Sequence, residues 1–493
     1  MKTLKKLLSV FAVVAMLLSM TVSANAATVT VVDNDDLTDH TYVAYQVLSG
    51  TQAPDSASLG SVVWGSGINS TKFLEEVNKI SGFETIDNPA AFAEKLATYA
   101  NNSVEAVAVS KAAYAAKTGS GIELEIGQNT IDPGYYLIVD VTENVGNEDA
   151  RNAALLQVTQ NGDVTIGNKT TIPTVEKWVQ KDGNWGKYED AYIGQSVSMK
   201  FEATVPSMYY FDTYPITFTD TATGLTPITI TSVSIEQTGK AATALAADTH
   251  YTLAPTNEDF TLTIADLKAL AVAASFDVKE AVKVVVEYTT TLATDADLGN
   301  DGNSNTVKLT YNANPNGSEN KETAQSTVYV YAFQIEGTKV DGVDQTKKLN
   351  GAVFALKNAD GKYYANTAGV VSWVDSEDDA TKSTSTADGL FGFTGLDAGT
   401  YTLVEITPPL GYNKAGDQEV TITPAYDNDT NKIKTLTNGE LTDGKVSVTV
   451  LNNKGATLPE TGGIGTTMFY VIGAALVIGA GVVLVSKKRM AAK

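Results

Sequence analysis

The chain has 493 residues and is strongly acidic, with 35 Lys and Arg against 57 Asp and Glu and a net charge of −22. Such a surface repels nucleic acid and anionic lipid, so we expect no nucleic-acid partner. There is no cysteine and there are only two histidines, His40 and His250, which excludes disulfides and thiol catalysis and argues against the usual zinc sites. Without a glycine-rich phosphate loop or a Gly-x-Ser-x-Gly elbow, we expect a protein that is not an enzyme and that uses no cofactor or metal.

The first 26 residues have the pattern of a secretory signal peptide. Lys2, Lys5 and Lys6 precede an apolar segment over 7–22, which is followed by Ala24-Asn25-Ala26. A basic start, an apolar core and a small-x-small site are typical of a segment that is removed on export. We therefore predict a signal peptide over 1–26 and a secreted mature chain.

The mature chain is long enough for about three domains, and the first of them, predicted over 27–171, mixes strands with helices. Asn88 fits the N-cap and Pro89 the first position of one amphipathic helix. The pattern of apolar residues predicts strands over 28–32, 40–47, 134–139 and 154–158, and helices over 71–80 and 89–99.

Two β domains are predicted to follow, over 172–326 and 327–454. Short alternating segments separated by turn residues are typical of β-sandwiches, and one helix-like interruption lies over 264–274. The predicted fold class is mainly β, with tandem immunoglobulin-like β-sandwich domains and helical insertions in the first domain.

Each predicted β domain has one lysine, one acid and one asparagine on the apolar face of a strand. Residues two apart along a strand share a face, so a polar residue in register with apolar ones points toward the core. For a single lysine, the plainer interpretation is a strand-end side chain that reaches water. Two complete sets in the same chain order favour a shared chemistry: Lys177, Asp220 and Asn305 in the middle domain, and Lys339, Glu405 and Asn452 in the last.

That chemistry is an internal cross-link. Burial lowers the pKa of a lysine and raises that of an acid, which leaves a neutral amine beside a neutral carboxylic acid. The amine can attack the asparagine amide while the acid, Asp220 or Glu405, shuttles protons. Loss of ammonia would leave the isopeptide bonds Lys177–Asn305 and Lys339–Asn452, each joining the first strand of its domain to the last. In the middle set, Asn312 and Asn314 lie nearby, but they do not follow the apolar register as Asn305 does.

The C-terminal segment over 455–493 has three parts, each with a physical meaning. Leu458-Pro459-Glu460-Thr461-Gly462 comes first, and an uncharged apolar run over 468–485 follows it. At 1.5 Å per residue, this run makes a helix of roughly one hydrocarbon thickness. The basic residues Lys487-Lys488-Arg489 would keep the end of the chain in the cytoplasm. The pentapeptide would then lie just outside the membrane, within reach of an extracellular enzyme.

In these features the chain resembles a Gram-positive sortase-assembled pilin of the shaft, or backbone, type. The C-terminal triple resembles a cell-wall sorting signal, which a sortase cuts between Thr461 and Gly462. Three further segments carry the resemblance: 401–412 with Glu405 is close to the family's E-box, 349–356 is similar to collagen-adhesin B-type modules, and 220–225 resembles the segment with the aspartate of the family's middle domain. The resemblance implies isopeptide bonds in the middle domain and in a collagen-adhesin-type last domain.

The resemblance also implies a lysine that receives Thr461 of another copy. The family places this lysine at the close of the first domain, in a Tyr-Pro-Lys-Asn pattern; here Lys169 occupies that place, with Gly-Asn before it. Lys181 and Lys187 are the alternatives. Expected partners are a pilin-class sortase, copies of the same chain, minor tip and basal pilins, and peptidoglycan. The alternative function is a singly wall-anchored adhesin that binds a host surface ligand.

Overall fold

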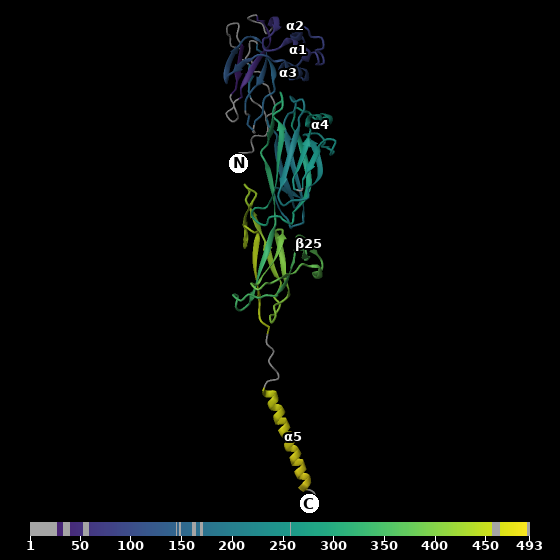
Figure 1. Cartoon of the computed structure of the whole chain (residues 1–493), viewed down its shortest axis with the longest axis vertical. Coiled ribbons are helices and arrows are strands. Elements are labelled where there is room, and N and C mark those ends of the chain that lie inside the picture. Colours follow the sequence, from purple (N-terminus) through teal and green to yellow (C-terminus); the bar gives the residue numbers. More distant parts are fainter. Residues whose placement is uncertain are drawn as a thin grey trace.

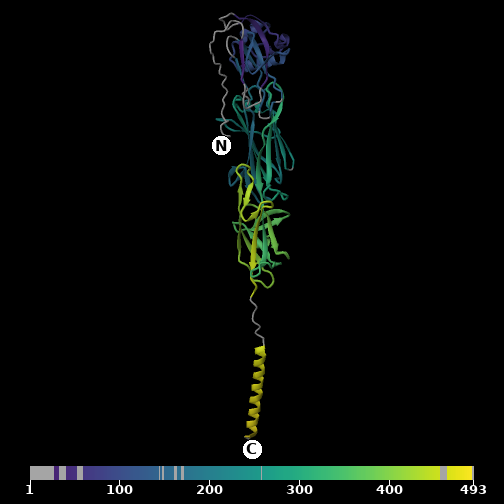
Figure 2. The ribbon, with the colours of Figure 1, turned by 90° about the vertical axis from the view of Figure 1, so that its left-hand side faces the viewer.

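Figures 1 and 2 show a computed structural model of the chain. Three β-rich bodies follow one another along the long axis in Figure 1, and the row stays narrow when turned by 90° in Figure 2. The predicted signal peptide, Lys169 and the pentapeptide at 458–462 lie outside the described residues. The structure describes residues 27–32, 40–52, 59–143, 145–146, 149–159, 164–167, 171–256, 258–455 and 464–490.

The N-terminal module, defined as the described residues of 27–167, has two sheets, with strand orders β5-β1-β8 and β3-β2-β6-β7; β4 pairs with β2. The four strands predicted for this part of the chain are confirmed as β1, β2, β6 and β7. All the strands of the module are β1 (Ala27–Val31), β2 (Tyr42–Gln52), β3 (Leu59–Trp64), β4 (Ile122–Leu124), β5 (Gly127–Ile131), β6 (Gly134–Asp140), β7 (Leu155–Thr159) and β8 (Val164–Ile166).

Three helices are inserted in this module: α1 (Ser70–Val77), α2 (Pro89–Leu96) and α3 (Val104–Ala116). The first two confirm the predicted helices. Asn88 caps α2, because its side chain accepts the Ala91 N–H at 2.9 Å. Helix α3 was not predicted from the sequence. Its buried residues are mostly alanines and valines distributed around the helix, so that no one-sided apolar pattern indicates it.

The middle module, defined as 171–331, is a β-sandwich with strand orders β10-β9-β12-β18-β14-β15 and β11-β21-β19-β13-β17-β16; β20 pairs with β19. Helix α4 (Leu267–Ala273) is the predicted interruption. The strands are β9 (Thr174–Lys181), β10 (Asn184–Gly186), β11 (Tyr188–Asp190), β12 (Ser196–Val205), β13 (Ile216–Ala222), β14 (Thr229–Glu236), β15 (Thr243–Ala244), β16 (Thr252–Pro255), β17 (Phe260–Ile264), β18 (Val282–Thr291), β19 (Asn303–Asn312), β20 (Asn320–Glu322) and β21 (Ser326–Tyr331).

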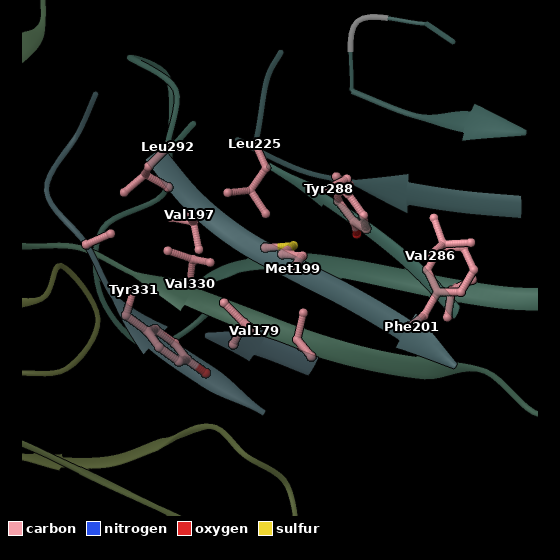
Figure 3. Close-up of a cluster of buried hydrophobic side chains, with 14 of the residues drawn as sticks. Val179, Val197, Met199, Phe201, Leu225, Val286, Tyr288, Leu292, Val330 and Tyr331 are labelled. Carbon is pink, nitrogen blue, oxygen red and sulfur yellow. The ribbon is translucent and has the colours of Figure 1, made fainter. Parts of the chain in front are cut away.

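Side chains from both sheets of the middle module meet in one core (Figure 3). Burial alternates residue by residue along β12 and β18, as expected for strands with one face inward. Met199, Phe201 and Val286 are fully buried there, and Tyr288 is 1% exposed. The phenol of Tyr288 therefore lies in the interior, where its hydroxyl needs a polar partner.

The third module, defined as 333–455, has a four-stranded sheet, β27-β22-β33-β32, and a facing sheet, β25-β24-β23-β28-β29, with β26 paired to β23. Strands β30 (Pro424–Tyr426) and β31 (Ile433–Leu436) form a separate hairpin. The other elements are β22 (Phe333–Asp341), β23 (Val353–Lys357), β24 (Tyr363–Thr367), β25 (Val370–Val374), the short 3₁₀ helix η1 (Glu377–Asp379), β26 (Ser383–Thr384), β27 (Leu390–Leu396), β28 (Gly399–Thr407), β29 (Gln418–Ile422), β32 (Gly439–Glu440) and β33 (Lys445–Asn452).

The middle and third modules share one hydrophobic cluster. Ala332 alone separates β21 from β22, and the Ile193 N–H donates across the junction to the Gly395 carbonyl at 3.0 Å. Tyr426 stacks on Tyr188 with ring centroids 3.8 Å apart. Because β21 pairs with β19 of the middle sandwich, a boundary at 326/327 would cut off a strand of that sandwich, and we propose Ala332 as the boundary.

Candidate functional sites

The structure brings Lys177, Asp220 and Asn305 together in the interior of the middle module. None of the three is exposed. Asp220 on β13 lies opposite Val307 of β19, so Asn305, two residues before Val307, lies on the same face diagonally across from the acid. Lys177 comes from β9 in the other sheet, and its Nζ donates to Asp220 Oδ2. The lysine therefore reaches its acid across the sandwich.

Tyr288 of β18 completes this cluster. Its hydroxyl lies 3.3 Å from Asp220 Oδ2 and 3.3 Å from Asn305 Oδ1, so the one phenol proton can serve either the acid or the amide. The ring also lies under the lysine, with its centroid 5.1 Å from Nζ. Asn305 Nδ2 has no hydrogen-bond partner among the described residues. The sequence pattern did not reveal Tyr288, because it continues the apolar alternation of β18 and looks like an ordinary core residue.

Burial sets the charge state of this pair. It lowers the pKa of the Lys177 amine, and the carboxyl group of Asp220 opposes that shift only in part. Burial likewise raises the pKa of Asp220 against the effect of Lys177. The two directions favour a neutral amine, which has a lone pair for attack, beside a protonated acid, which can hydrogen-bond an amide oxygen.

The third module holds an equivalent cluster of Lys339, Glu405 and Asn452, with at most 1% of each residue exposed. Lys339 Nζ lies 3.4 Å from Glu405 Oε1 and donates to the Val450 carbonyl at 3.3 Å. The Asn452 amide donates to Glu405 Oε1 and Oε2 at 3.1 and 2.9 Å. Burial lowers the pKa of Lys339, and Glu405 opposes this shift.

The two clusters distribute the same residue types differently between the sheets. Lys339 pairs with Val450 in the parallel ladder of β22 and β33, so Asn452 is a same-face neighbour of the lysine in one sheet, and Glu405 comes from the facing sheet. In the middle module, the acid and the asparagine share a sheet instead. The expectation that both bonds join a first strand to a last strand is wrong for the middle module, because β20 and β21 follow β19. It holds for the strands of the third module.

The alternative asparagines of the middle module are engaged elsewhere. The Asn312 amide donates to the Gly317 carbonyl at 2.9 Å, and its oxygen accepts the Asn314 and Glu319 N–H groups. The Asn314 oxygen accepts the Asn316 N–H at 2.9 Å. Both side chains thus shape the loop after β19, whereas Asn305 lies beside Asp220 and Tyr288.

The two alternative acceptor lysines already have close partners. Lys181 Nζ lies 2.7 Å from Asp190 Oδ2. Lys187 Nζ lies 2.9 Å from Glu176 Oε2 and donates to the Lys177 carbonyl at 2.6 Å. Lys169 is outside the described residues, two positions beyond Gly167, which follows the end of β8.

The C-terminal helix α5 (Ile464–Met490) contains the predicted membrane segment. Residues Met468–Met490 are long and apolar enough to cross a membrane, with Lys487, Lys488 and Arg489 in the last turn. Among the described residues, no group of histidines and acids is arranged to hold a metal ion.

Comparisons with known proteins agree with this architecture. Residues 333–453 match the SpaA family, described as a prealbumin-like fold domain, and residues 451–491 match the LPXTG cell wall anchor motif. The chain is thus a cell-wall-anchored surface protein with a prealbumin-like module. A search of curated proteins gives no significant match.

Among solved structures, the chain shares its fold with the T6 backbone pilin of serotype M6 Streptococcus pyogenes, at a TM-score of 0.54 and 15% identity, over 89% of this chain and 100% of that one. The pilus 2b backbone protein of group B streptococcus is 28% identical over 58% of this chain and 99% of its own, with a TM-score of 0.44. The predicted fold class, mainly β with tandem sandwich domains, is confirmed.

Proposed function

We propose that the chain is the shaft subunit of a covalently polymerised surface pilus. The observation that carries the proposal is the combination, in one chain, of a cell wall anchor motif with the three-module fold of a backbone pilin. A pilin-class sortase would cut between Thr461 and Gly462 and hold Thr461 as an acyl-enzyme. The lysine amine of another copy would then displace the enzyme and form an amide with the Thr461 carbonyl.

Lys169 is the acceptor lysine in this proposal. It follows β8 at the close of the N-terminal module, in the place that the family resemblance gives to the acceptor. The alternatives Lys181 and Lys187 are held in ion pairs by Asp190 and Glu176, so both amines are already engaged within the subunit. Minor pilins at the tip and base, and peptidoglycan at the base, complete the proposed assembly.

Within each subunit, the two buried clusters are proposed to form isopeptide bonds. The lysine Nζ attacks the asparagine Cγ, so that one C–N bond forms while the bond to the side-chain nitrogen breaks. A proton lost by the amine leaves with that nitrogen as ammonia after transfer through the acid, and no outside reactant is needed. The support for this step is the burial of all six residues and their hydrogen bonds.

The proposal is tested with Thr461→Ala in the native bacterium. Because the acyl-enzyme cannot form normally at this position, we expect the covalent ladder on denaturing gels to disappear and the subunit to stay in the membrane fraction. Thr457→Ala, which lies in the same tail but outside the motif, is the matched control and should polymerise normally. Wall attachment of the Thr461→Ala protein at the wild-type level would contradict the proposal.

A further inference from the structure

The end of the third module exposes two aliphatic side chains at the point where the chain leaves it. Val343, in the loop after β22, is 90% exposed, and Leu410, in the loop after β28, is 102% exposed. They are the most exposed of the large apolar side chains that the structure describes. We call Val343 and Leu410 the tip patch.

The two loops of the tip patch are held in place by Asp341. One carboxylate oxygen accepts the Val343 N–H at 2.9 Å, and the other accepts the Tyr412 hydroxyl at 2.7 Å. Tyr412 follows Leu410 by two residues, so a single carboxylate fastens both loops. Both exposed apolar side chains therefore lie on loops that Asp341 holds together, where the surface of a partner can cover them.

The tip patch borders the exit of the chain. Gly342, next to Val343, donates its N–H to the Asn452 carbonyl at 2.8 Å, and Gly455 donates to the Gly411 carbonyl at 3.0 Å. Only six residues, 456–461, lead from Gly455 to Thr461. Even fully extended, six residues span no more than about 20 Å. Whatever is joined to Thr461 therefore lies within reach of the tip patch.

A second exposed apolar pair lies at the other end of the proposed linkage. Val32 directly follows β1, and its N–H donates to the Ile166 carbonyl of β8 at 2.8 Å. Ile126 directly precedes β5, whose first residue, Gly127, pairs with Val31. Val32 is 46% exposed and Ile126 is 49% exposed. We call these two residues the receiving patch.

The receiving patch lies at the end of the sheet from which the chain continues to Lys169. Strand β8 ends at Ile166, and Lys169 follows three residues later. Ile126 and Val32 thus lie at the same end of the β5-β1-β8 sheet as Ile166, the residue after which the chain continues to the proposed acceptor. Each partner in a Thr461–Lys169 linkage then carries an exposed apolar pair at the point where the described chain leads, within a few residues, to its linked residue.

We infer that the tip patch of one copy docks on the receiving patch of the next copy in the polymer, so that each covalent linkage is accompanied by a non-covalent contact. This inference rests on the proposed function and identifies the surface through which successive subunits meet. The covalent link brings the two patches close together, and contact removes apolar surface from water. The contact would fix the angle between successive subunits.

The absence of cysteine makes the contact directly measurable. In Leu410→Cys, the only thiol of the chain can carry a benzophenone photo-crosslinker, and the labelled protein is polymerised and irradiated. We expect cross-links to peptides that contain Val32 or Ile126 of a neighbouring copy. Val272 on α4 is an exposed apolar residue of the middle module and belongs to neither patch. Val272→Cys is therefore the matched control and should not give these peptides. Monomer with Thr461→Ala shows which cross-links form within one copy.

A charge introduced into the tip patch tests whether the docking contact fixes the angle between successive subunits of the polymer. Leu410→Asp should leave the covalent ladder intact but shorten the persistence length of the filaments in electron micrographs, while Val272→Asp should change neither. The inference is overturned if the ladder is intact and the cross-links miss the receiving patch, or if Leu410→Asp filaments keep the wild-type persistence length. Absence of a ladder in the wild type would instead overturn the proposed function, and the inference with it.

Discussion

At the scale of single residues, the surroundings of the two buried lysines decide their chemistry. A lysine on the surface is protonated and cannot attack an amide. Lys177 and Lys339 are fully buried, each beside one acid and at least one aromatic ring, and burial lowers the pKa of both amines. The acid then has two functions: it offsets part of the cost of burying the lysine charge, and it transfers protons during the reaction.

The acids give the first prediction at this scale. Asp220→Ala and Glu405→Ala should fold but keep the ammonia that their own module would otherwise lose, so the intact mass should be higher by one ammonia than that of the cross-linked form. Each bond closes a loop of more than a hundred residues, for which chain-entropy estimates give about 4–5 kcal/mol of stability. We therefore expect lower melting temperatures and faster proteolysis.

The control for these variants is Asp212→Ala, an acid whose side chain is 83% exposed. It should show the wild-type cross-linking and stability. If the wild-type mass equals the uncorrected sequence mass, neither bond forms. If only Glu405→Ala retains an extra ammonia, the third module is cross-linked and the middle cluster is not.

Tyr288 gives a second prediction that separates the two modules. Its hydroxyl lies within 3.3 Å of both Asp220 and Asn305, and no tyrosine hydroxyl contacts the acid or the asparagine of the third cluster in the part of the chain that the structure describes. Tyr288→Phe keeps the ring and removes the proton donor, so loss of ammonia from the middle module should slow in freshly folded protein. The third module of the same molecule serves as the internal reference. Equal rates in Tyr288→Phe and the wild type would show that the hydroxyl has no part in the reaction.

At the scale of elements, a buried histidine holds the N-terminal module together where no cross-link is predicted. His40, just before β2, contacts Asp140 at the end of β6 and Asp149 in the following segment, with Nδ1–Oδ2 and Nε2–Oδ2 distances of 2.6 and 2.8 Å. The same segment continues to Arg151 and Ala154. Their backbone N–H groups donate to the Ala313 carbonyl and to Asn316 Oδ1 of the middle module. The histidine thus supports the junction between two modules.

The contacts of His40 predict that the stability of the N-terminal module depends on pH. Burial alone lowers the pKa of His40, but Asp140 and Asp149 outweigh it and raise the pKa from 6.5 to about 9. Because the folded pKa is the higher one, the stabilisation is complete below pH 6.5 and is lost as the pH rises through about 9. Its full size is on the order of 3 kcal/mol. The protection factors of the amide hydrogens in the segment 149–154, which are corrected for the base-catalysed rise of intrinsic exchange, should fall over this range.

The two histidines of the chain provide a matched pair for this test. His40→Gln should give low protection factors in this segment at every pH, without the fall between pH 6.5 and about 9. His250, whose ring accepts the exposed Ala246 N–H in the middle module, can be changed to Gln as the control without effect on that segment. An unchanged pH profile in His40→Gln would assign the dependence to other groups.

The elements also show what the sequence could and could not predict. In the N-terminal module, four strands and two helices followed from periodicity and caps, because their apolar residues lie on one face. Helix α3 and the contacts of His40 did not, because α3 has apolar residues on several sides and the two aspartates approach His40 only after folding. Lys177, Asp220 and Asn305 were predicted as site residues because each is a polar residue on an otherwise apolar strand face. Tyr288 was not predicted, because it continues the apolar alternation of β18.

At the scale of the whole molecule, the proposed bonds define the path of a pulling force. Tension between Lys169 and Thr461 would pass through Lys177–Asn305 and Lys339–Asn452, and the sequence inside each loop would carry no load. The stretch from Asn305 to Lys339 remains in the path. It contains β20 and β21 and continues through Ala332 into β22, so the junction between the middle and third modules bears the load through main-chain bonds and the shared core.

Tandem mass spectrometry of the polymer purified from the bacterial surface tests the central claim most directly. If the chain is a pilus shaft subunit with the proposed acceptor, digestion should give a branched peptide in which the Thr461 carbonyl is joined to the Lys169 side chain. A branch at Lys181 or Lys187 would keep the pilus and replace the acceptor. If Thr461 is found joined only to peptidoglycan amines and never to a lysine of another copy, the chain is a singly anchored surface protein, and its role as a shaft subunit is contradicted.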